Sequence, residues 1–185
     1  MAEPARSHAL YGAIEALPEG VVGEIIDGQL HTHPRPAGLH GDAASLLLID
    51  IGGPFYRGRG GPGGWRILAE PELHFRRNAE VLVPDLAGWR RERLPALPPD
   101  QRFEVVPDWV CEVLSLSTAG TDRELKMPVY ARYGVPYAWL VDPRAQRVET
   151  YGLEAGAWAQ TGSFTGTTPI QAPPFTELPI PPPWA

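Results

Sequence analysis

The stretch PDWVCEVLSLSTAGTDRELK, residues 107–126, is the most informative part of the chain for the fold. It opens with strand-forming residues, namely Val110, Cys111, Val113 and Leu114. Glu112 interrupts this apolar run. A carboxylate inside an apolar strand needs a cation, a proton or a hydrogen-bond donor, so Glu112 is the first candidate site residue.

A helix follows the strand after a polar turn. Thr121 with Glu124 three residues later predicts a capping box, and the helix is expected over residues 121–133. Asp122 and Lys126 are then one helical turn apart on the same face. The end of the strand and the start of the helix are therefore expected to face one small space.

Lys126 is the single lysine among 16 basic side chains, the other 15 being arginine. A composition so biased toward arginine suggests that this lysine has a role that a guanidinium cannot take. Lysine is a compact point charge whose pKa moves on burial, whereas guanidinium is broad and permanently charged. The alternative is an ordinary helical pair with Asp122.

A second acidic signal lies upstream in VLVPDLAGW, residues 81–89. Read as one strand over 80–89, this segment alternates so that Val81, Val83 and Asp85 share a buried face. Pro84 removes a backbone donor and indicates an edge or a bulge, which is where a strand re-aims a side chain. Considered alone, Asp85 would be interpreted as a turn residue. It becomes a candidate site residue because a second carboxylate, Glu112, follows 27 positions later.

Bulk composition indicates one α/β domain. The 185 residues, 43% hydrophobic, suffice for a single core. We expect an irregular lead-in over 1–20, one domain over 21–171, and a proline-rich tail over 172–185 that forms an extended strap. The net charge of -6 argues against nucleic-acid binding through a general positive field.

The remaining elements complete a central mixed sheet flanked by two helices. An Asp-Gly pair between 21–26 and 29–33 predicts a hairpin, and near-helical apolar spacing predicts a helix over 38–51. A glycine-rich loop without regular structure follows over 52–64. Further strands are expected at the following positions: 65–75 with a break at Pro71, 80–89, 137–141, 147–151 and 157–164.

One cysteine excludes an internal disulfide framework, and Cys111 is expected to be a small core residue. The sequence has neither a signal-peptide pattern nor an apolar run of membrane-spanning length, so a cytoplasmic protein that does not enter membranes is expected.

Other polar residues give weaker signals. His31 and His33 alternate on one strand face, but no third ligand lies nearby in sequence, so a surface pair is the simpler interpretation. Glu24 could face a site, but a solvated strand carboxylate is the favoured interpretation. His40, at the start of the first long helix, is either a site residue or a helix cap.

Arginines supply the local positive charge. Arg90, Arg91 and Arg93 form the densest basic cluster, and Arg57 and Arg59 lie in the glycine-rich loop. These five side chains are candidate phosphate contacts, with ordinary solvated surface as the alternative.

The order LVPD, WVCEVLS, DRELK and YARYGVPYAWLVD resembles the Uma2 family of putative restriction endonucleases, within the PD-(D/E)XK nuclease superfamily. The resemblance implies a restriction-endonuclease-like core, with Asp85 and Glu112 binding a divalent metal, and a homodimer. The superfamily pattern places lysine two residues after the acidic residue, where this chain has Leu114. The resemblance then implies that Lys126 reaches the site from the next helix.

The residues themselves suit phosphodiester hydrolysis. Two carboxylates, Asp85 and Glu112, with the Val113 carbonyl, fit Mg²⁺ (or Mn²⁺), and Lys126 would orient or deprotonate water or stabilise charge on the phosphate. Asp122 would add a ligand or, in the favoured interpretation, hold Lys126. The predicted function is a Mg²⁺-dependent DNA endonuclease. The alternatives are a non-catalytic nucleic-acid-binding or interaction domain on the same fold, and a hydrolase of smaller phosphate esters.

Overall fold

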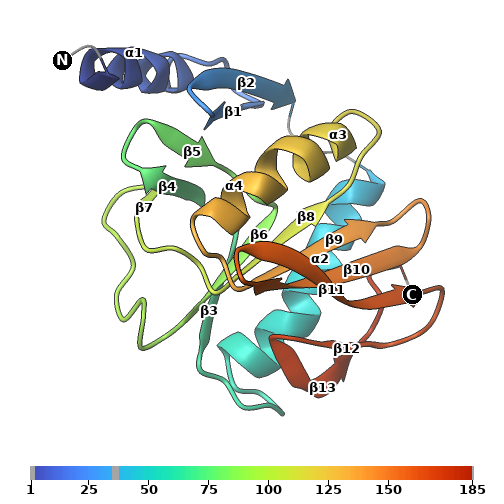
Figure 1. The fold of residues 1–185 in the computed structure, drawn as a ribbon. Coiled ribbons are helices and arrows are strands. Elements are labelled where there is room, and N and C mark those ends of the chain that lie inside the picture. The colour runs from blue at the N-terminus through green and yellow to red at the C-terminus, as the bar shows by residue number, and fades with distance from the viewer. Residues whose placement is uncertain (1–2, 35–37, 185) are drawn as a thin grey trace.

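Two sheets organise the chain in the computed structural model, which describes residues 3–34 and 38–184 (Figure 1). The larger sheet has six strands in the order β11-β10-β9-β8-β6-β3. Its strands are β3 (Trp65–Ala69), β6 (Leu86–Arg90), β8 (Trp109–Val113), β9 (Tyr137–Asp142), β10 (Arg147–Glu154) and β11 (Ala157–Thr165). Only the pair β8 and β9 is parallel, so the sheet is mixed. The predicted α/β fold with a central mixed sheet flanked by helices is confirmed.

Helices cover both faces of this sheet. The helix α2 (Leu39–Ile51) lies on one face, and a second helical segment lies on the other (Figure 1). Strand β8 divides its side chains between them: Trp109, Cys111 and Val113 face the core with α2, whereas Val110 and Leu114 face the other core. Because side chains alternate along a strand, Glu112 points to the same side as Val110 and Leu114.

The second helical segment runs without interruption from Ala119 to Arg132. It consists of α3 (Ala119–Thr121), the π-helical turn η2 (Asp122–Lys126) and α4 (Met127–Arg132). The predicted helix exists, but the Thr121 capping box is wrong, because the helix starts earlier and Thr121 makes no side-chain cap bond. Pro128 is accommodated in the first turn of α4, directly after the π-helical turn.

The smaller sheet holds the N-terminal part of the chain. Its order is β2-β1-β5-β4-β7, from β1 (Val21–Ile26), β2 (Gln29–Pro34), β4 (Glu72–Arg76), β5 (Glu80–Leu82) and β7 (Arg102–Phe103). The predicted hairpin is confirmed: β1 pairs with β2, and Asp27 and Gly28 both have positive φ, as a two-residue turn requires.

The expectations for the two ends of the chain and for the glycine-rich loop are also wrong. Residues 3–15 form a helix, α1 (Glu3–Glu15), where an irregular lead-in was expected; residues 1–2 of that lead-in lie outside the described residues. Gly52–Tyr56 is a π-helical turn, η1, inside the expected structureless loop. The proline-rich tail contributes to a strand pair, β12 (Ile170–Ala172) with β13 (Phe175–Ile180), and is not an extended strap.

Aromatic packing explains why the tail folds back. Phe175 is fully buried, and its ring lies about 5 Å from the rings of Phe55, Trp65 and Trp109. Trp139 donates a hydrogen bond from Nε1 to the Pro173 carbonyl at 2.8 Å. Burial of an aromatic side chain stabilises a fold by roughly 1.5–3 kcal/mol, which outweighs the weak local propensity of this segment.

The expected single strand over 80–89 is two strands in two different sheets. Glu80–Leu82 is β5 and Leu86–Arg90 is β6, and the connection carries Pro84 and Asp85. The alternation that placed Val81, Val83 and Asp85 on one face therefore does not apply. The break itself agrees with the prediction that Pro84 marks an irregular point.

None of the helices within residues 3–34 and 38–184 is long and apolar enough to cross a membrane.

Candidate active site

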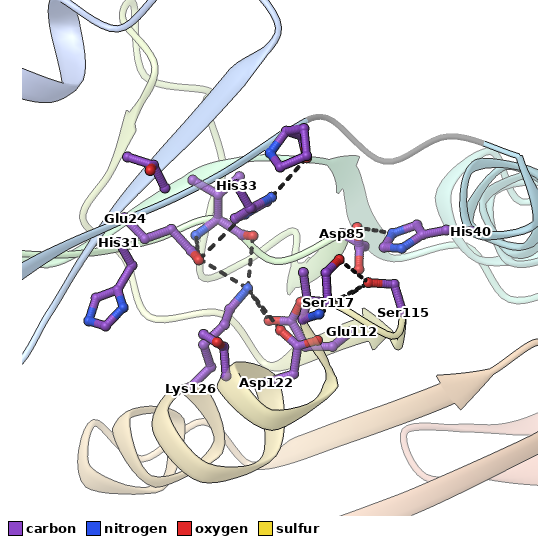
Figure 2. A pocket seen from close by; sticks show the side chains of 15 residues that line it. Glu24, His31, His33, His40, Asp85, Glu112, Ser115, Ser117, Asp122 and Lys126 are labelled. Carbon is purple, nitrogen blue, oxygen red and sulfur yellow. Dashed lines mark hydrogen bonds and ion pairs between the residues drawn. The ribbon is translucent and has the colours of Figure 1, made fainter.

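A polar cavity of about 410 Å³ lies where the two sheets meet the start of the second helical segment (Figure 2). The lining residues are Glu24, His31, Thr32, His33, Pro34, His40, Val83, Asp85, Glu112, Ser115, Ser117, Thr118, Thr121, Asp122 and Lys126. The chain thus brings together residues from β1, β2, α2, β8 and η2 that are distant in sequence.

Lys126 is at the centre of an ionic cluster in this cavity (Figure 2). Its Nζ lies 2.8 Å from Glu112 Oε1 and 3.0 Å from Glu24 Oε1. It also donates a hydrogen bond to the Val83 carbonyl at 3.1 Å. Asp122 is further away, with Oδ1 at 3.8 Å from Nζ. The predicted meeting of the strand end with the helix start is confirmed.

Asp85 lies beside this cluster and is held by two donors. Since Leu86 pairs with Cys111, Asp85 comes opposite Glu112 just outside the strand ladder. Its Oδ2 accepts a hydrogen bond from the Val113 backbone N–H at 2.7 Å, and its Oδ1 lies 2.6 Å from His40 Nε2. His40 therefore contacts the candidate site, as one of the two sequence interpretations had it.

The cluster is almost closed to water. The exposed fractions are 1% for Glu24, 2% for Glu112, 4% for Asp122 and 2% for Lys126. Burial would lower the pKa of Lys126, but Glu112, Glu24 and Asp122 outweigh this and raise it well above its ordinary value. The ammonium therefore stays protonated at any physiological pH.

The pKa values of the carboxyl groups in the cavity shift in opposite directions. Burial opposes ionisation of Glu24, yet Lys126, His33 and the Val83 N–H together lower the pKa of Glu24 to about 2. Burial raises the pKa of Glu112 well above its ordinary range, although Lys126 works against this. Burial likewise raises the pKa of Asp122. The Lys126 ammonium and its neighbours thus outweigh the cost of burying a charge for Glu24, but not for Glu112 or Asp122.

Among the residues that the structure describes, the site therefore carries more acidic groups than lysine or arginine side chains. Four carboxyl groups, on Glu24, Asp85, Glu112 and Asp122, surround one lysine. Oxygen ligands of this kind are those that Mg²⁺ and Ca²⁺ take, and the buried Asp122 Oδ2 has no hydrogen-bond partner among the described residues. The donor chemistry therefore fits a divalent cation.

The arrangement is nevertheless centred on the ammonium. Within the described ranges, 3–34 and 38–184, no three histidine, cysteine, aspartate or glutamate side chains are placed together as a ready-made metal centre. A cation that binds here would have to share the carboxylates with Lys126.

Leu114 fills the position where the superfamily pattern has lysine. Its side chain is buried in the hydrophobic cluster that also contains Met127 and Val129 of α4. Lys126 instead reaches Glu112 in the cavity from η2, as the resemblance implied. Asp122 belongs to the same helical turn but lies too far from Lys126 for a good ion pair, so the favoured interpretation, that it holds Lys126, has weak geometric support.

Glu24 is the site residue that sequence reasoning assigned wrongly. It was interpreted as a solvated carboxylate, yet it is buried and bonded to Lys126 and the Val83 N–H. The signal was available: Glu24 lies in VVGEII between apolar neighbours, as Glu112 lies in WVCEV. The argument applied to Glu112 holds equally for Glu24.

The histidine pair and the cysteine stay outside the ionic contacts of Lys126. His31 and His33 line the cavity, and His33 Nε2 lies 3.7 Å from Glu24 Oε2. Cys111 is fully buried in the core, and burial raises the pKa of its thiol, so it is the core residue that was expected.

The five candidate arginines lie away from the cavity, and none of them lines it. Arg90 ends β6, whereas Asp85 precedes it, which separates them by roughly 16 Å along the strand. The Arg90 guanidinium lies over the Trp65 ring, and those of Arg57 and Arg91 lie over the Tyr56 ring. Arg93 pairs with Asp108.

Comparison with known proteins agrees with this architecture. A family model described as "Putative restriction endonuclease", Uma2, matches residues 9–181. A crystal structure described as a putative nuclease belonging to DUF820 from Anabaena variabilis is similar, with a TM-score of 0.66 and 22% identity over 91% of this chain and 93% of that one. A search of curated proteins gave no match.

Proposed function

Because the chain belongs to the Uma2 family of putative restriction endonucleases, we propose that it is a Mg²⁺-dependent endonuclease that hydrolyses DNA phosphodiester bonds. The observation that supports this most strongly is the meeting of Asp85, Glu112 and Lys126 at one cavity from the β5–β6 connection, β8 and η2. Carboxylates next to a cationic donor form a suitable site for a phosphate diester under attack by water.

Asp85 and Glu112 are the proposed ligands of Mg²⁺ or Mn²⁺, with the Val113 carbonyl as a third. When bound, the cation neutralises charge on the phosphate and lowers the pKa of bound water. The Val113 N–H and His40 hold the two Asp85 oxygens from opposite sides, which fixes the carboxylate before any substrate binds.

Lys126 serves as a permanent cation in this proposal. Sequence reasoning left open whether it deprotonates water or stabilises charge. Since the surrounding carboxylates raise the pKa of Lys126 in the metal-free site, we assign it charge stabilisation rather than proton abstraction. Its role is to orient the attacking water and to compensate charge that develops on the phosphate.

DNA binding is assigned to the arginine face, defined as Arg57, Arg59, Arg90, Arg91 and Arg93. These side chains supply positive charge in a chain of net charge -6. We also propose a homodimer, since a duplex cut in both strands requires two sites. Light scattering over a wide concentration range tests this assembly, and a constant monomer mass would contradict it.

Cleavage of plasmid DNA by four variants tests the proposed reaction. Asp85→Ala and Glu112→Ala should abolish cleavage, and Lys126→Ala should slow it by roughly a hundredfold or more. Lys126→Arg should recover little, because guanidinium does not fit a compact slot. Cleavage by Asp85→Ala or Lys126→Arg at the parent rate would contradict the assignment.

A second candidate is a metal-dependent hydrolase of smaller phosphate esters. The position of the arginine face away from the cavity favours it, since Lys126 is the only lysine or arginine in the lining among the residues that the structure describes. Hydrolysis of a small phosphate ester together with intact plasmid DNA would favour this candidate.

A further inference from the structure

Tyr130 is a buried residue that the proposed reaction has so far not used. It lies on α4, four positions after Lys126, and has no exposed surface. Its hydroxyl donates a hydrogen bond to Glu112 Oε1 at 2.5 Å. That distance is typical of a strong bond from a hydroxyl to a carboxylate oxygen.

Both strong donors to Glu112 converge on the same oxygen. Oε1 accepts the Tyr130 hydroxyl and lies 2.8 Å from the Lys126 ammonium. An oxygen held by two donors has little remaining capacity for a third partner. The other carboxylate oxygen, Oε2, is then the one available to a cation.

The two donors differ in how firmly they can orient the carboxylate. Lys126 is shared among Glu24, Glu112, Asp122 and the Val83 carbonyl, so its ammonium can move among acceptors. Among the described residues the Tyr130 hydroxyl has a single acceptor, and its buried ring packs against Phe75 with the ring centroids 6.0 Å apart. A rigid donor with one acceptor sets orientation; a shared ammonium mainly supplies charge.

From this geometry we propose that Tyr130 is a positioning residue that holds Glu112 by Oε1 and so leaves Oε2 for the divalent cation. The inference rests on the proposed metal-dependent function and extends it to a neighbouring residue. Partners of metal ligands commonly contribute tenfold to hundredfold in metal affinity, because they fix the ligand before the metal arrives.

The test is a calorimetric titration with Mg²⁺ alone on the parent, Tyr130→Phe and Tyr133→Phe. Tyr133 is a matched control directly after the same helical segment, where its ring stacks on Phe75 with the centroids 4.8 Å apart and does not line the cavity. Tyr130→Phe should weaken Mg²⁺ binding by roughly tenfold to a hundredfold, while Tyr133→Phe binds as the parent does.

Cleavage assays at increasing Mg²⁺ separate positioning from a loss of structure. In Tyr130→Phe the Mg²⁺ concentration for half-maximal cleavage should rise by the same factor as the dissociation constant, and most of the rate should return at saturation. Unchanged Mg²⁺ affinity in Tyr130→Phe would overturn the inference while leaving the nuclease proposal intact. No Mg²⁺ binding by the parent would overturn both.

A structure of the parent with Mn²⁺ bound decides the matter if Tyr130→Phe does not fold. Metal on Oε2, with the Tyr130 hydroxyl still on Oε1, supports the inference. Metal on Oε1, or a Tyr130 hydroxyl displaced from Glu112, overturns it.

Discussion

The charged side chains near the two ends of strand β6 differ in burial. At the end near Asp85, the Lys126 cluster is enclosed, and Lys126, Glu24 and Glu112 are each no more than 2% exposed. At the other end, the arginine face holds its charges at the surface, over aromatic rings and beside Asp108. One strand thus connects a buried ionic cluster with a solvated one.

The comparison explains the use of lysine and arginine in this chain. The only lysine occupies the buried end, where a compact ammonium fits between carboxylates. Arg90 and Arg91 lie at the open end, where a flat guanidinium can stack on a ring and keep contact with water. The same formal charge is therefore strongly coupled at one end and screened at the other.

Removal of the cation at the buried end should have the largest effect on stability. Lys126→Met leaves Glu24 and Glu112 buried without their cation, so the free energy of unfolding should fall by about 3–5 kcal/mol. The matched surface change is Arg93→Met, which removes the ion pair between Arg93 and Asp108. The Arg93 side chain is 43% exposed in this pair. Arg93→Met should lower the free energy of unfolding by no more than about 1 kcal/mol.

Urea unfolding at neutral pH measures both variants. Equal losses in Lys126→Met and Arg93→Met would show that the two ends of β6 do not differ as described.

The pH dependence of stability should sharpen the same comparison with a smaller effect. The folded protein lowers the pKa of Glu24 from 4.5 to about 2, so its contribution is complete above pH 4.5 and is lost as the pH falls toward 2. Each pH unit in this window removes up to about 1.4 kcal/mol.

Glu24→Gln lacks this contribution, so the stability gap between parent and variant should narrow from pH 4.5 to pH 2. Glu112 and Asp122 have raised pKa values and act in the opposite direction, but they are present in both proteins. A gap that stays constant over this window would contradict the assigned state of Glu24.

Charge reversal on the arginine face should have the smallest effect. Arg90→Glu with Arg91→Glu should weaken DNA binding and reduce the dependence of log affinity on log salt by roughly one for each lost phosphate contact. Arg77→Glu, on strand-flanking surface of the smaller sheet, is the control and should change neither. An unchanged salt slope in the double variant would leave the arginine face as ordinary solvated surface.

Much of the site could be predicted because its residues violate local patterns. Glu112 interrupts an apolar strand, Lys126 is the only lysine, and Pro84 marks the break before Asp85. These are local signals, and the cavity brings all three regions together.

The remaining features depend on contacts between distant segments. Glu24 lies between apolar neighbours, but its partner Lys126 is 102 positions away in the sequence, and only the fold brings the two together. The sequence around Tyr130 indicates only a core residue of a helix, and the hydrogen bond from its hydroxyl to Glu112 becomes visible only in the fold. The proline-rich composition of the tail predicts an extended strap. Its strand pair depends on the packing of Phe175 against Trp65 and Trp109, which are distant in sequence. Tertiary packing overrides local propensity in each case.

The central claim is that Asp85 and Glu112 share one divalent cation next to Lys126. Calorimetric titration of Mg²⁺ into the parent and into Asp85→Asn tests it most directly, since asparagine keeps the shape of the side chain and removes its charge. The account predicts saturable Mg²⁺ binding by the parent and none by Asp85→Asn, with both proteins folded. Equal Mg²⁺ affinity in the two proteins would contradict it.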